Sequence, residues 1–379
     1  MTIRTLMTTA AACAVLAAPA MADINIGASL AETGPAAFLG DPEAKTLRME
    51  VDKINAEGGI NGEQINLIIY DDGGDANKAK TFATRLVEDD EVVAVIGGTT
   101  TGPTMAMIPV FEDAEIPFIS LAGAVEIVEP VNPWVFKTPH TDRMACEKIF
   151  ADMKAQGFSK VGMISGSDGF GKSMQAQCKG VAEASGVEIV ADEVYGPQDA
   201  DMTPQLTNIK GSGAEAILNS GMGQGPAVVT RNHTQLAIEA PLYQSHGVAS
   251  KQFIELAGTE AAEGVRLPAA ALLVADQLGD DNPQKPVVQG YRDAYESETG
   301  EDVSTFGGHA YDALYILKAA IEKAGSTEPA AIRDAIEQTT GFVGTAGEVN
   351  YSPEDHLGLT LDAFEMLEIK DGEWTIVAE

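Results

Sequence analysis

The feature that most constrains this chain is the stretch Val92–Ala124, in which a strand, a small-residue loop, a helix and a second strand follow one another. The apolar run Val92–Ile96 is typical of a buried parallel strand. The hydroxyls of Thr99–Thr101 come next, and Pro103 suits the first position of a helix that continues to about Ala114. Two strand ends and a helix N-terminus should therefore converge on one crevice. Free N–H groups and hydroxyls there suit a carboxylate or phosphate, unless the threonines only cap the helix in an ordinary tight turn.

Strand and helix signals alternate through most of the chain, which predicts parallel sheets covered by helices on both faces and so an α/β fold. The pattern changes after about Gly264, where three helices and a terminal hairpin around Asp371-Gly372 are expected. The main predicted strands are Ile24–Leu30, Gln64–Tyr70, Pro117–Leu121, Val161–Ser165, Val187–Val194, Ala216–Asn219 and Pro241–Gln244, and the late helices are Val287–Thr299, Gly308–Lys323 and Pro329–Gln338.

Residues 1–22 have the features of a cleaved targeting segment. Arg4 is their only charge, Leu6–Ala18 is apolar, and Ala20-Met21-Ala22 has the form of a cleavage site. The apolar core is too short to span a bilayer. We therefore expect an exported protein that begins at Asp23, with no later membrane-spanning segment, and a length that suits two lobes better than one core.

The formal net charge of −33 among 379 residues excludes a general nucleic-acid binder, which needs a basic face, and argues against an anionic membrane surface. The acidity is spread along the chain, as expected for a solvated surface. Only Cys146 and Cys178 remain after cleavage, on helices predicted to share a lobe. Export permits a disulfide between them, but spacing cannot place them within bonding distance, and two free buried thiols are the favoured interpretation.

Several stretches in order resemble the branched-chain amino-acid type of periplasmic solute-binding protein, the receptor of ABC importers. They are Gly34–Gly40, Ile54–Gly62, Tyr70-Asp71-Asp72, the Thr99–Ala106 loop and Ala310–Ala313. The resemblance covers nearly all of the chain after residue 22. It implies a type I periplasmic-binding-protein fold, with two doubly wound parallel-sheet lobes joined by three crossovers and the ligand enclosed between them.

The same resemblance implies a monomer without a cofactor or catalytic activity, which delivers a small-molecule ligand to ABC permease subunits in the inner membrane. A receptor that passes its solute to a membrane sensor fits the sequence equally. Lobe crossings are expected near Pro139, Val274 and Asn350. Lobe 1 is then formed by residues 23–139 with 275–349, and lobe 2 by residues 140–274 with 350–379.

Four further stretches look closer to a branch of this family that binds aromatic and other hydrophobic carboxylates. They are Trp134–Pro139, Tyr243–Val248, Val274–Leu278 and Ser304–Asp312. Carried over position by position, the family's carboxylate-holding hydroxyl falls at Thr100 or Thr101. Its backbone contacts fall at Ala122, Gly123 and Ala124, the last of which lacks the threonine hydroxyl usual in an amino-acid binder.

The resemblance also places an acidic position of lobe 2 at Asp142, which would either face a ligand ammonium or only cap the following helix. The family's common tyrosine is Phe170, without a hydroxyl. The acidic residue that pairs with an α-ammonium is replaced by His246, and a protonated imidazole binds an anion instead. The remaining candidates are apolar or aromatic side chains around the ligand: Phe38, Leu39, Met222 and Tyr311.

These residues predict a hydrophobic or aromatic carboxylate as the ligand, with a branched-chain or other hydrophobic amino acid as the alternative that Asp142 favours. For His246 the plain alternative is a loop histidine with satisfied bonds, and for Phe170 and Met222 it is core packing. We expect the carboxylate to dock first on lobe 1 and lobe 2 then to close over it by a hinge motion.

One motif points to another class of protein. Gly166–Ser173 fits the phosphate-binding pattern G-x-x-x-x-G-K-S and follows a predicted strand, so an NTPase is the rival interpretation. Export away from ATP and the lack of a clear strand ending in a magnesium-binding aspartate oppose it. The five histidines show no metal-binding spacing, and no serine-hydrolase elbow occurs.

Overall fold

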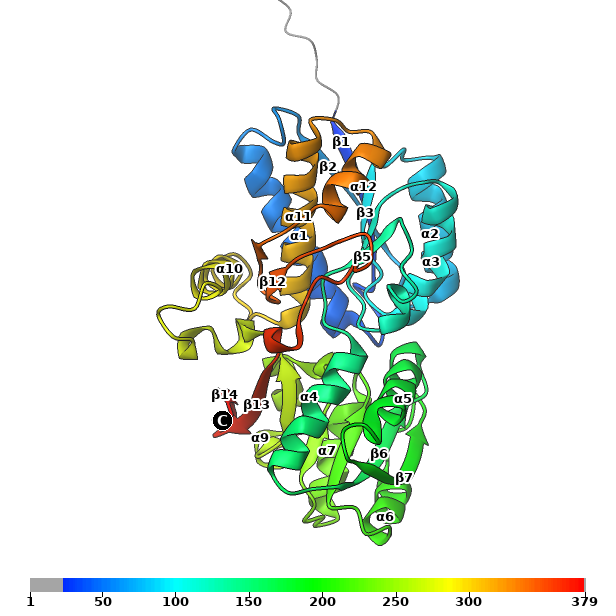
Figure 1. The fold of residues 1–379 in the computed structure, drawn as a ribbon, viewed down its shortest axis with the longest axis vertical. Coiled ribbons are helices and arrows are strands. Elements are labelled where there is room, and N and C mark those ends of the chain that lie inside the picture. The colour runs from blue at the N-terminus through cyan, green and yellow to red at the C-terminus, as the bar shows by residue number, and fades with distance from the viewer. Residues whose placement is uncertain (1–22, 378–379) are drawn as a thin grey trace, which may run out of the picture.

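The computed structural model describes residues 23–377, so the predicted targeting segment 1–22 lies outside the described residues. The chain forms two lobes, one above the other in Figure 1, each built on a parallel sheet. Between residues 23 and 377, no helix is both long and apolar enough to cross a membrane.

The first lobe is built on a five-stranded sheet in the order β2-β1-β3-β4-β5, with every pair of neighbours parallel. Apart from the edge strand β2, which is mostly part-exposed, its strands are buried runs, as expected of a sheet covered on both faces. They are β1 (Ile24–Leu30), β2 (Ile65–Asp71), β3 (Ala94–Gly97), β4 (Phe118–Ser120) and β5 (Val135–Lys137). The covering helices are α1 (Ala37–Ala56), α2 (Ala76–Glu88), α3 (Thr101–Asp113), α11 (Thr305–Ala324) and α12 (Pro329–Glu337).

The second lobe is built on a seven-stranded sheet in the order β14-β13-β10-β9-β8-β6-β7. Neighbours from β7 to β10 are parallel, and the terminal hairpin β13–β14 adds to the edge in antiparallel fashion. The strands are β6 (Lys160–Gly166), β7 (Glu188–Tyr195), β8 (Ala216–Ser220), β9 (Leu242–Gln244), β10 (Arg266–Ala269), β13 (Glu365–Lys370) and β14 (Glu373–Ile376). The helices are α4 (Asp142–Ala155), α5 (Gly169–Ala182), α6 (Thr203–Gly211), α7 (Gly225–Gln235), α8 (Lys251–Ala257) and α9 (Thr259–Ala262).

The chain passes between the two sheets three times: after β5, between β10 and α11, and between β12 (Glu348–Val349) and β13. On the return, α10 (Lys285–Thr299) stands at the side of the molecule and α11 packs along α1 (Figure 1). The short β11 (Phe342–Val343) pairs with β12. The predicted α/β fold with two parallel-sheet lobes is therefore confirmed, whereas the predicted lobe boundaries stay a prediction.

Two local predictions are wrong. Helix α3 begins at Thr101, so Pro103 is its third residue and not its first. Cys146 and Cys178 are joined by a disulfide, with their Cα atoms 5.0 Å apart, because α4 and α5 pack side by side and bring the two buried side chains together. The favoured interpretation of two free thiols is thereby corrected.

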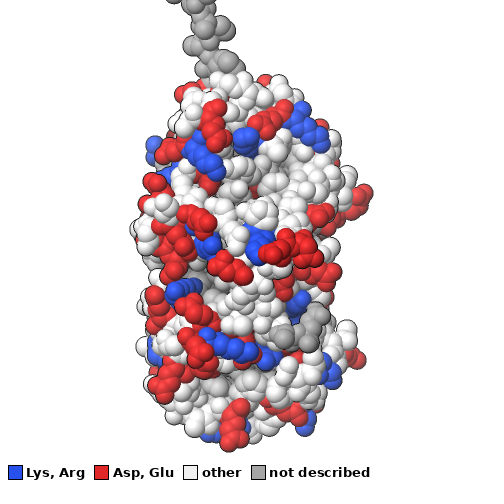
Figure 2. All heavy atoms as spheres, turned by 90° about the vertical axis from the view of Figure 1, so that its left-hand side faces the viewer, with Lys and Arg blue, Asp and Glu red and all other residues white. Residues whose placement is uncertain are grey.

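The surface charge agrees with a solvated acidic surface. Figure 2 shows carboxylates scattered over the face that it presents, with lysine and arginine side chains between them. Several form exposed ion pairs, such as Lys45 with Asp41 and Glu301 and Arg292 with Asp276. Pairs of this kind contribute little to stability in water.

Candidate functional site

The strand order of each sheet predicts where a ligand binds. In the first sheet the order reverses between β1 and β3, and in the second it reverses between β6 and β8. Ligands of open α/β sheets bind outside the carboxyl ends of the strands at such points. The loops that follow these strands meet between the lobes, where they enclose a narrow cavity of about 30 Å³.

The cavity is lined mainly by apolar and aromatic side chains from both lobes, with a few polar groups. The lining residues are Leu39, Thr99, Thr100, Thr101, Leu121, Gly123, Pro139, Phe170, Met222, His246, Gly247, Phe306 and His309. A wider cleft between the lobes shares Thr100, Thr101, Phe170 and Met222 with it, so the cavity lies next to open solvent. Within residues 23–377, no aspartate or glutamate lines the cavity itself.

The loop after β3 contributes the hydroxyls. Gly97 and Gly98 adopt φ angles of 149° and 68°, which a residue with a side chain rarely adopts, and a Cβ on Gly98 would lie 2.2 Å from the Thr104 hydroxyl. This turn delivers Thr100 and Thr101 to the N-terminus of α3. Thr100 occupies the N-cap position, but its side chain makes no cap hydrogen bond. The first N–H groups of α3 and the positive end of its dipole are therefore left uncapped beside the cavity.

The three threonines differ in their bonds. The Thr99 hydroxyl already has partners within the protein. Its Oγ1 accepts from the Ala31 N–H at 3.0 Å and donates to the buried carboxyl of Glu43. Burial raises the pKa of Glu43 well above its usual value, which favours the neutral acid. Thr101 is buried, and its Oγ1 has no hydrogen-bond partner among the described residues. An unpaired buried hydroxyl is costly, so one that lines a cavity points to a ligand.

The second lobe contributes Phe170, Met222 and His246. The rings of Phe170 and His246 meet edge to face, with centroids 5.4 Å apart. His246 is buried, with only 8% of its surface exposed. Neither of its ring nitrogens has a hydrogen-bond partner in the part of the chain that is described. Gly123 of the first lobe lies directly against this pair: a Cβ there would be 2.9 Å from His246 Nε2 and 2.9 Å from Phe170. The two lobes are therefore in contact at the cavity.

Burial favours the neutral form of both cavity histidines. Burial, aided by the charge of Lys137, lowers the pKa of His246 to about 3. Burial also lowers the pKa of His309 to about 3, and its Nδ1 likewise has no partner among the described residues. Burial therefore disfavours the protonated form of His246, which would bind an anion most strongly. As a neutral ring it offers one N–H donor and one acceptor.

The predicted site residues divide into two groups. The structure brings Leu39, Thr100, Thr101, Gly123, Phe170, Met222 and His246 to the cavity, and places Ala122, Ala124, Asp142 and Tyr311 outside its lining. The two alanines are buried in the core beside α3, and the Ala122 N–H already donates to Ser120 Oγ. Tyr311 packs between Tyr291 and Tyr315, with ring centroids 5.0 and 4.4 Å away.

Asp142 was predicted to cap α4 or to face an ammonium. The N-cap is Thr141, whose hydroxyl accepts from the Met144 N–H, and Asp142 is the first residue of the helix, so the capping prediction is wrong by one position. The Asp142 carboxylate is fully buried and accepts from the N–H groups of Val125 and Arg143 and from the Ser173 hydroxyl. Burial raises its pKa. Its hydrogen bonds join α4 to α5 within the protein.

Sequence reasoning missed Phe306 and His309 as lining residues. Both lie near the N-terminus of α11, three positions apart and so on one face of the helix. That spacing, within the stretch Ser304–Asp312, was the available signal. Phe38, proposed as a cavity residue, packs edge to face on Phe306 instead and lines a different hollow.

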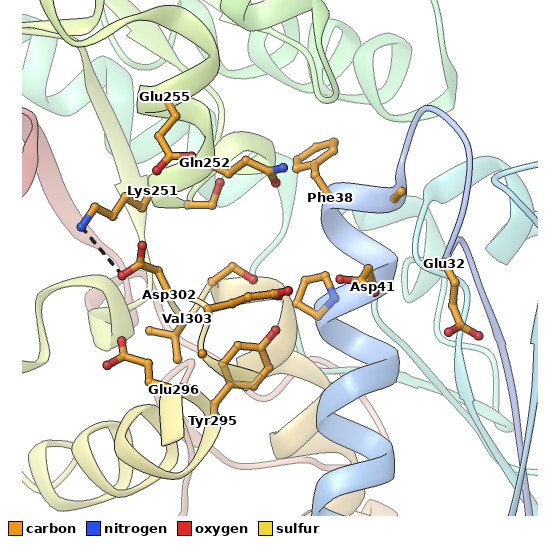
Figure 3. A pocket seen from close by; sticks show the side chains of 16 residues that line it. Glu32, Phe38, Asp41, Lys251, Gln252, Glu255, Tyr295, Glu296, Asp302 and Val303 are labelled. Carbon is orange, nitrogen blue, oxygen red and sulfur yellow. Dashed lines mark ion pairs between the residues drawn. The ribbon is translucent and has the colours of Figure 1, made fainter. Parts of the chain in front are cut away.

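That second hollow is acidic and does not suit an anion. It lies between the start of α1 and the α8 and α10 segments, and Figure 3 shows Glu32, Asp41, Glu255, Glu296 and Asp302 around it, with Lys251 paired to Asp302. Most of these carboxylates have cationic neighbours, as Glu32 has Arg48 and Asp41 has Lys45. No group of acidic, cysteine or histidine side chains between residues 23 and 377 is arranged to hold a metal ion.

Comparisons with known proteins agree with this geometry. The sequence model described as "Periplasmic binding protein" matches residues 23–373. The Leu/Ile/Val-binding protein BraC3 of Rhizobium johnstonii is 27% identical, over 98% of this chain and 99% of its own length.

Two solved structures have the same fold. An extracellular ligand-binding receptor of Rhodopseudomonas palustris HaA2 superposes with a TM-score of 0.88 at 29% identity, over 94% of this chain and all of the receptor. LivJ, the branched-chain amino acid transporter substrate-binding protein of Streptococcus pneumoniae, solved with isoleucine, superposes with a TM-score of 0.83 at 25% identity, over 93% of this chain and 97% of its own.

Proposed function

Since the chain belongs to the periplasmic binding protein family, of the branched-chain amino-acid transporter type, we propose that it is the periplasmic receptor of an ABC importer and that it captures a small hydrophobic or aromatic carboxylate without an α-ammonium group. The observation that carries the ligand class is the lining of the cavity. It offers an uncapped helix N-terminus and a free hydroxyl to an anion, but among residues 23–377 no carboxylate for an ammonium.

The anionic end of the ligand docks at the start of α3. Thr101 is favoured over Thr100 for this contact, because its buried hydroxyl lacks a partner. Helix N–H groups and a hydroxyl form charge-assisted hydrogen bonds with a carboxylate. The neutral His246 donates a further hydrogen bond from the opposite lobe.

The apolar body of the ligand packs against the remaining lining. Leu39 and Phe306 face it from the first lobe, and Phe170 and Met222 from the second. Each 100 Å² of apolar surface that such a body buries contributes about 2.5 kcal/mol. Lobe closure about the three crossovers brings the two sets together, and the closed form is what the permease recognises.

A hydrophobic amino acid is the alternative ligand, as the names of the relatives suggest. It requires a partner for its ammonium. Asp142 would be that partner, but its carboxylate already accepts three hydrogen bonds within the protein. Hydrogen bonds within the protein also oppose phosphate binding at Gly166–Ser173. Asp168 already caps α5, and the Ser173 hydroxyl is bonded to Asp142.

A matched pair of ligands tests the proposal. L-Phenylalanine and 3-phenylpropionate differ only in the ammonium group, as do L-leucine and 4-methylpentanoate. In calorimetric titrations of the protein without residues 1–22, the acids should bind and the amino acids should bind at least tenfold more weakly. Tight binding of the amino acids with no binding of the acids would overturn the ligand class and leave the family unchanged.

Replacing His246 refines the test. His246→Ala should weaken the acids by roughly 1–3 kcal/mol, the contribution of one hydrogen bond to a charged group. His233→Ala is the control, because His233 lies on α7 and bonds to the Ala240 carbonyl away from the cavity. Equal affinities for the two variants would remove His246 from the site.

A further inference from the structure

The cavity would bury a charge that its lining does not balance. A carboxylate moved out of water needs hydrogen bonds and an opposite charge nearby, or its desolvation is prohibitive. Thr101, His246 and His309 supply hydrogen-bonding groups, but the two imidazoles are neutral. The N-terminus of α3 supplies only a partial positive charge, so a full compensating charge has to come from behind the lining.

Lys137 is placed to supply it. Of the lysines and arginines that the structure describes, it alone is buried, with 0% of its surface exposed at the end of β5. Its Nζ donates to the His140 carbonyl at 3.2 Å. An ammonium has three N–H donors, so this bond leaves part of its capacity unused.

Lys137 bonds to the backbone of His140, and the His140 ring belongs to a stack of rings that reaches the cavity. The His140 ring stacks on Phe364 at 3.7 Å between centroids, and Phe364 also contacts His246 edge to face at 5.6 Å. His140 and Phe364 belong to two of the segments that cross between the lobes. The charge of Lys137 lowers the pKa of His140, His246 and His309, so its field reaches the residues on both sides of the cavity.

We propose that Lys137 is a positioning residue for anion selectivity: its buried ammonium balances the ligand carboxylate without touching it, and it takes up a proton from solvent as the ligand binds. This inference rests on the proposed function. It adds to that function a charged group outside the cavity lining. It also adds a proton to the binding equilibrium.

The direction of the pH dependence follows from burial. In the empty protein, desolvation lowers the pKa of Lys137 to about 7, so above that pH the side chain is mostly neutral. A bound anion raises this pKa, because it favours the charged form. The complex then holds more protons than the empty protein above pH 7, so affinity falls as the pH rises past 7 and is level below it.

Among the groups near Lys137, the buried Asp312 also has a pKa raised to about 7 and acts on Tyr351 through its field, so the Lys137 variants below are needed to assign the window. His246 and His309 titrate near pH 3, and burial lowers the pKa of His140 well below its usual value. Tyr351, which donates to the Lys137 carbonyl, has a pKa raised by burial and stays neutral. Asp142 acts on Lys137 through its field, and burial raises its pKa while the Ser173 hydroxyl lowers it.

The experiment titrates the protein with 3-phenylpropionate and with its uncharged amide at pH 6.5 and 8.5. At pH 8, two buffers of different ionisation enthalpy report protons taken up per ligand. The wild-type protein should bind the acid about tenfold more weakly at pH 8.5 than at 6.5, since one unit of pKa shift is tenfold in affinity. It should take up between half a proton and one proton.

Lys137→Met should weaken the acid at pH 6.5 at least tenfold, spare the amide, and lose both the pH dependence and the proton uptake. Lys370→Met, at an exposed lysine of β13, should behave as wild type. If Lys137→Met does not fold, Lys137→Arg, which stays charged at both pH values, should bind the acid with a level pH profile and without proton uptake. Acid binding with no proton uptake and a level pH profile overturns the inference but not the proposed function. No binding of any hydrophobic acid overturns the proposed function, and the inference with it.

Discussion

Two loops of this protein have the same place in the two lobes and opposite local chemistry. The loop before α3 and the loop before α5 each follow a parallel strand at the point where the strand order reverses, and each is rich in small residues. In the first loop, Thr100 makes no cap bond and Thr101 Oγ1 has no partner among the described residues. In the second, Asp168 accepts from the Gly171 N–H, and the Ser173 hydroxyl donates to Asp142.

The difference teaches that capping, and not the sequence motif, decides which loop can hold an anion. The second loop carries the phosphate-binding pattern, yet a carboxylate of the protein already occupies its helix N-terminus. The first loop matches no phosphate motif and keeps its donors free. The four predictions below test this contrast, beginning with the largest effect.

Closing the two lobes on each other requires a glycine at position 123, in the loop after β4. Gly123→Val should abolish binding, with a loss of more than about 100-fold, because its side chain would collide with Phe170 and His246 at the closed interface. Calorimetry with 3-phenylpropionate measures this. Gly180→Val, on an exposed face of α5 with no atom near the added Cβ, is the control. Wild-type affinity in Gly123→Val would show that the ligand does not bind between these surfaces.

The second loop leads into a helix that is covalently fixed. The disulfide ties α5 to α4 across 32 positions, whereas α3 contains no cysteine and is held by packing and hydrogen bonds. Cys146→Ala with Cys178→Ala should lower the free energy of unfolding by about 2–4 kcal/mol, with ligand affinity changed less than threefold. Urea denaturation measures the first and calorimetry the second. An unchanged midpoint would mean that the bridge does not stabilise this lobe.

The free hydroxyl of the first loop should affect binding and not stability. Thr101→Val keeps the shape of the side chain and removes a hydroxyl without a protein partner. Affinity for the acid should fall by roughly 10- to 100-fold, because one charge-assisted hydrogen bond is lost. The melting temperature should stay level or rise. A loss of stability with unchanged affinity would reverse the roles assigned to the two loops.

The Ser173 hydroxyl, which lies in α5 just after the second loop and is bonded to Asp142, should show the opposite result. Its loss should affect stability and not binding. Ser173→Ala removes a donor to the buried Asp142 carboxylate and should lower the free energy of unfolding by roughly 1–2 kcal/mol. Affinity should change less than threefold, since Ser173 does not line the cavity. The same titration and denaturation series reports both quantities, and a large drop in affinity would place the second loop in the binding site.

Much of the fold was predictable from the sequence because hydrophobic periodicity and turn residues fix the alternating strands and helices. Strand β1 has the predicted bounds, and the terminal hairpin forms around Asp371-Gly372. The start of α3 could not be predicted exactly, because a proline is allowed at several positions in the first turn of a helix. The disulfide depends on how α4 and α5 pack, which spacing does not encode.

The candidate site was predictable where the chain itself delivers residues to a strand end, as at Thr100, Thr101 and Met222. It was not predictable where burial decides the chemistry. Sequence gives His246 an ordinary imidazole that titrates near neutral pH, and only the folded structure shows that burial lowers its pKa to about 3. Tyr311 and Asp142 were assigned by resemblance, and their neighbours turn them toward other partners.

A crystal structure of the complex with 3-phenylpropionate tests the central claim most directly. The account predicts the carboxylate within hydrogen-bonding distance of Thr101 Oγ1 and the first N–H groups of α3, with the phenyl ring between Phe170 and Phe306. A ligand bound with its carboxylate away from α3, and with Thr101 and His246 both out of reach, would contradict it.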